Sequence, residues 1–297
     1  MTGIICLDKG INKTSFSCVA AMRRIAGEKK AGHAGTLDPM ATGVLPIFFG
    51  RATRFMELLP DHTKGYTAEV KLGMTTDTLD TTGETLSVCE SHVTREELEN
   101  ALIDFRGNIF QVPPMYSALS KDGVRLYELA RKGIEVEREA RPVTIEKLEL
   151  LDFNEEEQTF IIDVKCSKGT YIRTLADDIG KKLGCGAAMS ALRRTFAAGF
   201  SIEKCYTEET LRKMSEEGTL QNAVISVEEA LNIYDEITVT APQANRFHNG
   251  GALDLVRVRG KKEVGFYRVY DPNRIFLGVG EITEARDELK VKRVYSE

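Results

Sequence analysis

Residues 32–46 read GHAGTLDPMATGVLP, and the first eight of them combine a histidine, a carboxylate and two glycines in one short stretch. Gly32 and Gly35 permit close backbone approach or unusual dihedral angles. Pro39 restricts the residue before it, Asp38, to extended backbone conformations. A carboxylate held on such a loop suits a nucleophile or a general base. An isolated Asp-Pro pair is more often a turn or a helix cap, so these residues alone leave both interpretations open.

Length and composition describe a globular protein with room for one large or two ordinary domains. The chain has 297 residues, of which 42% are hydrophobic and 29% charged. Its apolar runs stay well short of the ~20 residues that a membrane helix requires. The amino-terminal segment mixes charged residues into its apolar ones, unlike an export signal. We therefore expect a soluble protein that works in the cytoplasm and does not bind membranes.

The cysteines and glycines give no sign of a metal or cofactor site. Six cysteines lie at least twelve residues apart, so no C-x-x-C pair is present. We interpret them as buried reduced thiols of a cytoplasmic protein. The glycine-rich loops that bind dinucleotides or nucleoside triphosphates are also missing. We therefore expect a protein that uses no cofactor and no metal.

Charge is unevenly distributed along this chain, whose net charge is -5. Residues 9–31 carry six basic side chains and one acidic one, and residues 165–195 carry seven and two. Acidic side chains concentrate in residues 203–236, which carry nine against three basic ones. If the two basic stretches fold onto one face, that face can hold a polyanion despite the acidic total. Solvated helix faces would explain the same charges, so both interpretations stay open.

Strand patterns predict an α+β fold with a mixed, largely antiparallel sheet. Residues 2–7 are typical of a short buried strand, and the alternating apolar residues of 66–72 indicate a strand with one buried face. Residues 143–153 and 159–166 are two further apolar runs separated by a short turn, which favours an antiparallel hairpin.

Three helices have recognisable ends. One is predicted from Ser15 to Gly27, with a serine start and a glycine stop. A second is predicted from Thr94 to Arg106, because Thr94-x-x-Glu97 is a capping box and Gly107 follows. A third, from Pro242 to His248, precedes several short strands near the end of the chain.

Two segments are expected to stand apart from this core. Residues 111–141 combine a Pro-Pro pair with scattered basic side chains, and we predict that they form an insertion projecting from the core. Past the acidic stretch, short strands and turns predict a small β-rich domain. We place the boundary between residues 235 and 236, which gives domains at 1–235 and 236–297.

Five stretches carry a family resemblance, because they occur in one order along the first two thirds of the chain. GHAGTLDP is similar to the signature of the TruB-type pseudouridine synthases, in which the aspartate of G-x-L-D-P is catalytic. The other stretches that resemble this family are GYTAEVKLG at 65–73, TDTLDTTG at 76–83, PPMYSAL at 113–119 and CSKGTYIRTLADDIG at 166–180. The opening LDKGINKTS at 7–15 departs from the family's usual pattern, with Gly10 in place of proline and Asn12 in place of glycine.

The resemblance implies an isomerase that acts on RNA. In the family's reaction the C1'–N1 bond of a uridine breaks, the uracil turns, and C5 rejoins C1'. Such a reaction needs a carboxylate and a closed pocket, and neither metal nor nucleotide. By resemblance Asp38 is the catalytic nucleophile. The substrate-binding residues implied are Tyr66, which stacks on the uracil; Arg173, which pairs with Asp38; Tyr171, a late proton acceptor; His33, which takes the place of the extruded base; and Leu192, an apolar wall.

The resemblance also implies the substrate, which is the uridine at position 55 in the T arm of tRNA. The buried base has to be flipped out of the folded tRNA, at a cost that stacking on an aromatic ring can offset. Residues 111–141 resemble the family's RNA-gripping thumb, and the carboxyl-terminal segment resembles a PUA domain, which binds RNA. We expect a monomer without an obligate protein partner.

Three other functions compete with this interpretation. The chain could be a tRNA folding chaperone, as its only role or beside catalysis. It could be the relative that works inside a guide-RNA particle, although those chains usually end in a lysine-rich tail. It could also be a small-molecule enzyme in which Asp38 works with Asp77 or Asp80 as an acid–base pair. Without the accompanying motifs, Tyr66 and Leu192 would be core residues, Arg173 a surface cation and His33 a turn residue.

Overall fold

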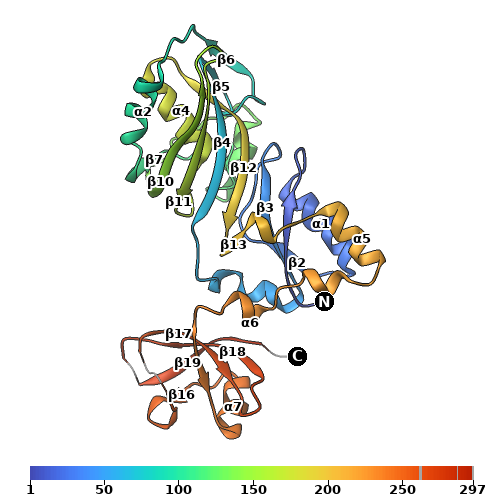
Figure 1. The fold of residues 1–297 in the computed structure, drawn as a ribbon. Coiled ribbons are helices and arrows are strands. Elements are labelled where there is room, and N and C mark those ends of the chain that lie inside the picture. Colours follow the sequence, from blue (N-terminus) through green and yellow to red (C-terminus); the bar gives the residue numbers. More distant parts are fainter. Residues whose placement is uncertain (261–262, 286, 296–297) are drawn as a thin grey trace.

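The structure, a computed structural model, describes residues 1–260, 263–285 and 287–295 (Figure 1). The positions left out, 261–262, 286 and 296–297, all belong to the predicted carboxyl-terminal domain and lie outside the described residues. In the part of the chain that is described, no helix is long and apolar enough to cross a bilayer.

A ten-stranded mixed sheet forms the larger part of the molecule. Two of its neighbouring pairs are parallel, β1 with β14 and β3 with β12, and the other pairs are antiparallel. The α+β prediction is therefore confirmed. In order across the sheet, the strands are β14 (Tyr206–Thr207), β1 (Gly3–Lys9), β3 (Thr42–Phe49), β12 (Ala187–Ala197), β4 (Lys64–Leu72), β11 (Thr159–Cys166), β10 (Arg141–Asn154) and β7 (Gly107–Gln111), with β2 (Ala31–His33) beside β3 and β13 (Phe200–Ser201) beside β12.

The predicted strands recur with small changes of length. Alternate residues of β4 are buried from Tyr66 to Leu72, as their apolar spacing indicated. The hairpin of β10 and β11 is antiparallel, which confirms that prediction. The first strand runs on past Leu7 to Lys9, whose side chain is fully buried. The strand was predicted to end at Leu7 because the prediction relied on periodicity and hydrophobicity, and a charged residue follows these signals in neither respect.

Four helices pack against this sheet and enclose its core. Helix α4 (Ile172–Leu183) lies on β12 and β4, with α2 (Arg95–Ile103) beside it, while α1 (Ser15–Ala26) lies on β3 next to α5 (Glu208–Glu216). Leucines and isoleucines of these helices join the strand residues in one apolar cluster. Burial of that cluster is the main stabilising contribution, since each fully buried aliphatic side chain adds about 1.5–3 kcal/mol.

Helix ends agree with the sequence in kind and differ in position. Thr14, not Ser15, caps α1 by accepting a hydrogen bond from Ser17, because the Ser15 hydroxyl bonds to the Leu37 backbone instead. Gly27 ends this helix with a left-handed φ of 60°. The capping box of Thr94 is present, but α2 ends at Ile103 rather than Arg106. Residues 104–106 instead form a turn, in which backbone N–H groups donate to the carbonyl three residues earlier.

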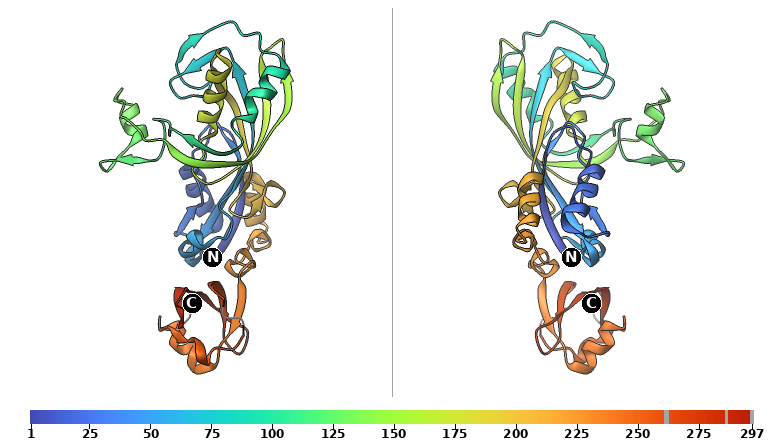
Figure 2. Two further views of the ribbon diagram at one scale, coloured as in Figure 1. Left: turned by 90° about the vertical axis from the view of Figure 1, so that its left-hand side faces the viewer. Right: turned by 90° about the vertical axis from the view of Figure 1, so that its right-hand side faces the viewer.

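Residues 111–141 contain a slender arm that reaches away from the sheet (Figure 2). The arm holds a two-stranded ribbon of β8 (Ser120–Lys121) and β9 (Val124–Arg125), followed by the short helix α3 (Leu126–Ala130). Near its base lies a second small hairpin, β5 (Met74–Thr76) with β6 (Thr85–Val88). We refer to residues 111–141 as the arm and to residues 74–88 as the hairpin.

The last part of the chain forms a five-stranded sheet of its own (Figure 1). Helix α7 (Ala241–His248) packs against it and begins one residue before the predicted Pro242, with Thr240 and Gln243 making a capping box. The elements of this region and the connection to it are η2 (Ile202–Lys204), η3 (Leu220–Ala223), α6 (Val227–Ala230), β15 (Asp235–Thr238), α7 (Ala241–His248), β16 (Leu253–Asp254), η4 (Leu255–Arg257), β17 (Gly265–Tyr270), β18 (Phe276–Ile282) and β19 (Glu288–Val294).

An aromatic cluster joins the two sheets. Phe55, in the 3-10 helix η1 (Gly50–Leu58), stands with its ring centroid 6.5 Å from Phe276 of β18 and 5.9 Å from Tyr295. These rings belong to one buried cluster with residues of β1 and β3. The carboxyl-terminal sheet is therefore packed on the larger one and shares apolar core with it.

The expectation that the cysteines are buried is wrong in part. Cys6, Cys18 and Cys166 are buried, but Cys89 is exposed and the other two are half-buried. Cys89 follows the hairpin, which stands away from the core. Among the basic side chains of the two stretches, Lys9, Arg173 and Arg194 are buried, so these three cannot contribute to an exposed cationic face. Others are in ion pairs: Lys13–Glu208, Lys165–Glu146, Lys181–Asp177, Lys182–Asp104 and Arg193–Asp8.

Candidate active site

Asp38 lies on the loop between β2 and β3, and the backbone of that loop is held by side chains from α1 and β1. The Ser15 hydroxyl bonds to both the N–H and the carbonyl of Leu37, at 2.9 and 3.2 Å. The ammonium group of Lys9 donates to the carbonyls of Ala41 at 2.5 Å and Pro39 at 3.2 Å. Its positive charge is compensated by carbonyl dipoles in a buried position, where burial lowers the pKa of Lys9.

Arg194 of β12 holds the same loop from the other side. Its guanidinium donates to Val44 O at 2.7 Å, to Gly35 O at 3.0 Å and to Thr36 O at 3.4 Å. The side chain is fully buried. Because a guanidinium presents several donors in a fixed plane, one arginine can fix several carbonyls at once. The conformation of the loop is thus determined by three side chains distant in sequence.

Asn12 occupies the position where the usual motif has glycine. Its φ is +61°, in the left-handed region that asparagine tolerates better than most residues. Its backbone N–H donates to Pro39 O at 2.8 Å. The departure from the motif therefore leaves a left-handed residue in contact with the Asp38 loop.

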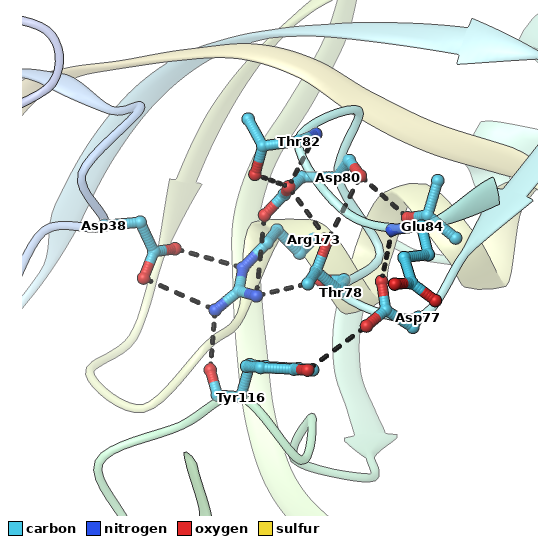
Figure 3. Close-up of polar contacts among 9 residues, drawn as sticks. Asp38, Asp77, Thr78, Asp80, Thr82, Glu84, Tyr116 and Arg173 are labelled. Carbon is cyan, nitrogen blue, oxygen red and sulfur yellow. Dashed lines mark hydrogen bonds and ion pairs between the residues drawn. The ribbon is translucent and has the colours of Figure 1, made fainter. Parts of the chain in front are cut away.

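Asp38 forms a two-pronged ion pair with Arg173, the second residue of α4 (Figure 3). Arg173 Nε is 3.0 Å from Asp38 Oδ2, and Arg173 Nη2 donates to Asp38 Oδ1 at 3.4 Å. The arginine side chain is 6% exposed and the aspartate side chain 36%. A carboxylate bound by a guanidinium fork is held in a defined orientation, and one edge of this carboxylate remains open to solvent.

The remaining donors of Arg173 are satisfied by the hairpin and by the base of the arm. Nη1 donates to Thr78 O and Nη2 to Tyr116 O, both at 2.8 Å, and Nη1 lies 3.6 Å from Asp80 Oδ2. Asp80 itself is buried. Its Oδ1 accepts from the Thr78 hydroxyl at 2.9 Å and from Thr82 through both its backbone and its hydroxyl, at 3.0 and 2.5 Å.

These contacts favour a structural role for Asp77 and Asp80. Both Asp80 oxygens are engaged, and both Asp77 oxygens accept hydrogen bonds, from Glu84 N at 2.7 Å and from the Tyr116 hydroxyl at 3.1 Å. An acid–base partner for Asp38 needs a carboxylate that can exchange protons with substrate. Asp77 and Asp80 instead orient their neighbours.

The pKa of Asp38 is raised above its ordinary value by burial, which outweighs the opposing effect of Arg173. The neighbouring negative charge of Asp80 raises it further. Arg173 is the partner that the family resemblance implied, and its charge favours the ionised acid. Desolvation favours the neutral acid and is the larger of the two effects.

Tyr66 and His33 lie near Arg194, and Leu192 precedes Arg194 by two residues on β12. Tyr66 and Leu192 are buried in the main core, 5% and 8% exposed. Burial raises the pKa of Tyr66 to about 12, and the adjacent Arg194 partly opposes that rise. His33, at the end of β2, has its pKa lowered by burial and by Arg194, so its ring is neutral at pH 7. Its buried Nδ1 has no hydrogen-bond partner among the described residues.

Tyr171 is the residue directly before α4, the helix that carries Arg173. Its backbone N–H and carbonyl bond to the Gln111 side chain at 2.8 and 3.0 Å. Burial raises the pKa of its phenol, and the charge of Asp38 adds to that effect. Within the described ranges, Arg173 is the predicted site residue that bonds to Asp38, while Tyr66 and Tyr171 are near enough to feel its charge.

The chain matches three family models that follow one another along its length. Residues 23–172 match the TruB family pseudouridylate synthase amino-terminal domain, residues 173–232 the tRNA pseudouridylate synthase B carboxyl-terminal domain, and residues 236–295 the carboxyl-terminal domain of pseudouridine synthase II TruB. The chain belongs to the TruB family of pseudouridine synthases. It is therefore an isomerase by family.

Relatives of known name match almost end to end. A tRNA pseudouridine synthase B of Clostridium perfringens is 46% identical over 97% of this chain and 96% of its own length. The protein of the same name in Pseudomonas fluorescens is 45% identical over 96% and 92%. Among solved structures, a Cbf5-Nop10-Gar1 complex superposes with a TM-score of 0.75 at 25% identity, covering 99% of this chain and 85% of that one. An H/ACA RNP bound to a substrate RNA shares the fold, with a TM-score of 0.75 at 24% identity over 100% and 86%.

Several residues that hold this synthase's site were not assigned by sequence reasoning. Lys9, Ser15 and Tyr116 lie in stretches that resembled the family, yet no role was attached to them. Arg194 lies two positions after Leu192 and was counted only among the basic residues of 165–195. A signal was available, because a basic residue inside a run that otherwise reads as a buried strand needs carbonyl or carboxylate partners.

Proposed function

We propose that this chain converts uridine 55 in the T arm of tRNA to pseudouridine, with Asp38 as the nucleophile. The observation that carries the proposal is the Asp38–Arg173 fork, a half-exposed carboxylate oriented by a buried guanidinium. The substrate is inferred from the relatives that bear the name tRNA pseudouridine synthase B.

The product is an isomer of the substrate, so the proton that leaves C5 is balanced by a proton gained at N1. Asp38 assists departure of uracil N1 from C1', either by bonding to C1' or by stabilising the positive charge that develops there. The detached base turns so that C5 bonds to C1', and this step breaks any bond between Asp38 and C1'. The C5 proton then leaves to a base, and N1 gains a proton. Arg173 orients the carboxylate, and the phenol of Tyr171 is the proposed acceptor of the proton.

The other proposed roles concern the pocket. Tyr66 stacks on the flipped uracil, Leu192 forms an apolar wall, and His33 enters the place that the base vacated. A neutral imidazole, as the lowered pKa of His33 implies, suits insertion among bases better than a charged one. Retention of the free base requires exclusion of water, and this supports an apolar lining.

The division of labour proposed here assigns chemistry to residues 1–235, with residues 111–141 as the gripping insertion, and RNA affinity to a PUA-like unit at 236–297. We propose a monomer that works in the cytoplasm without an obligate protein partner. The solved structures that share the fold at a TM-score of 0.75 include protein complexes. A measurement of molecular mass on the purified protein, with tRNA, tests whether this protein is a monomer.

Asp38→Asn is the decisive substitution. The amide keeps the size of the side chain and removes its charge and nucleophilicity, so pseudouridine formation should fall by about 10³-fold or more while tRNA still binds. The measurement is single-turnover tritium release from tRNA labelled at uracil C5, beside a binding titration. Near-normal conversion by a folded Asp38→Asn protein would remove the proposal.

The matched control is Asp163→Asn. Asp163 of β11 pairs with Lys147 of β10 across their hairpin, and it makes no contact with Asp38 or Arg173 that the ion pairs of the described residues include. Asp77 is less suitable, because its carboxylate bonds to Tyr116 next to Arg173. Asp163→Asn should convert tRNA at the wild-type rate.

A further inference from the structure

Tyr116, at the base of the arm, makes two hydrogen bonds that join the arm to the surroundings of Asp38. Its carbonyl accepts from Arg173 Nη2 at 2.8 Å, and its hydroxyl donates to Asp77 Oδ2 at 3.1 Å (Figure 3). The same Nη2 donates to Asp38 Oδ1. One nitrogen of Arg173 therefore joins the nucleophile's carboxylate to the backbone of the arm.

Asp77 is itself fixed, so it can act as an anchor. Its Oδ1 accepts from Glu84 N at 2.7 Å, which closes the turn of the hairpin. That turn also supplies Thr78 O and Asp80 to Arg173. Tyr116 thus connects the arm to a turn that already touches the opposite side of the guanidinium, and the two attachments together define where the Tyr116 carbonyl lies.

We propose that Tyr116 and Asp77 form a latch that positions Arg173 according to the placement of the arm, so that the arm's hold on RNA is transmitted to Asp38. Both are positioning residues, since neither touches the reacting atoms. This inference rests on the proposed function, and it adds that binding energy from the arm is used in the chemical step. When the arm is in place, the carbonyl of Tyr116 accepts a hydrogen bond from Arg173. The two contacts from Arg173 to the carboxylate of Asp38 are then aligned.

The physical basis is the tight confinement of Arg173. With 6% of its side chain exposed, the guanidinium has no water to replace a lost carbonyl, so it must turn toward another acceptor. Turning shifts the Nη2 contact to Asp38, and misplacement of a reacting group by about 1 Å can cost about a hundredfold in rate. A tyrosine that merely stabilised the arm would affect RNA affinity instead.

The latch is tested with Tyr116→Phe, Asp77→Ala and the double variant of the full-length protein. Phenylalanine keeps the ring and removes only the hydroxyl. We expect the single-turnover rate at saturating enzyme to fall about ten- to a hundredfold with tRNA affinity within about threefold of wild type. The double variant should be no slower than Asp77→Ala, within about threefold, because the two side chains form one unit.

Tyr206→Phe is the matched control, a tyrosine of β14 that lies outside the arm and the hairpin. Its rate and affinity should equal those of wild type. An unchanged rate in Tyr116→Phe, a loss confined to affinity, or multiplicative losses in the double variant would each overturn the latch. These results are separable from failure of the proposed function, in which the wild-type protein itself would form no pseudouridine in tRNA.

Discussion

Asp38 experiences opposing electrostatic influences at the scale of one residue. Desolvation and Asp80 raise the pKa of its carboxyl, Arg173 lowers it, and the first effect is the larger. The folded protein consequently binds this proton more tightly than the unfolded chain does. Stability from this group is present below the ordinary pKa of 3.8 and is lost as pH rises through the higher folded pKa.

Asp38→Asn should therefore be more stable than wild type at neutral pH, since the amide resembles the protonated acid. The difference in melting temperature, variant minus wild type, should be near zero at about pH 3.5 and should grow with pH until it levels off above the folded pKa of Asp38. Thermal melts of both proteins across this range measure it. A difference that shrinks as pH rises would show that Arg173, not burial, dominates.

Helix α4 illustrates a conflict between local and tertiary preferences at the scale of an element. Gly180 lies inside this helix, where alanine is intrinsically better by about 0.8–1.0 kcal/mol. A Cβ at this position would stand 2.2 Å from Ala187 N and 2.4 Å from Gly186 C, both backbone atoms at the start of β12. The same helix carries Arg173 near its start, where Arg173 pairs with Asp38.

We expect Gly180→Ala to destabilise the protein by about 1–3 kcal/mol, because the backbone it meets cannot move aside as a flexible side chain can. Urea unfolding measures this change. Lys182→Ala, on the exposed part of the same helix, removes a surface ion pair and should stay within about 1 kcal/mol. A stability gain in Gly180→Ala would mean that helix propensity outweighs packing here.

Association of the two sheets matters at the scale of the whole molecule. Because Phe276 and Tyr295 pack on Phe55, a fragment ending near residue 235 exposes apolar surface that is buried in the full chain. We expect such a fragment to melt at a lower temperature and to bind tRNA more weakly, with its single-turnover rate at saturating enzyme within about tenfold of the full chain. Collapse of the saturated rate in a fragment that circular dichroism shows to be folded would contradict the proposed division of labour.

Salt dependence reports on charges across the whole surface. Exposed basic side chains gather at the end of α1, at Arg23, Arg24, Lys29 and Lys30. If several of them contact phosphates, tRNA affinity should fall about tenfold or more between about 50 and 200 mM salt. Replacing Lys29 and Lys30 with alanine should flatten the slope of log affinity against log salt. An unchanged slope would exclude both lysines from the interface.

The sequence by itself determined the parts of this protein that depend on local signals. Alternation marked β4, the capping box marked α2, a glycine stop marked the end of α1, and a run of motifs led to the family. Each signal is readable because it rests on residues a few positions apart. Asp38 and Arg173 were paired through the resemblance, and the geometry of the structure agrees with that pairing.

Only the tertiary structure decided which charged side chains are buried. Lys9 and Arg194 lie 185 positions apart in the chain, yet both hold the backbone of one loop, and Asp80 and Tyr116 reach Arg173 from separate segments. Burial of a cation is stabilising only when carbonyls or carboxylates are already arranged around it. That arrangement arises when β1, β3 and β12 pair side by side, and no pattern within any one of these strands specifies it.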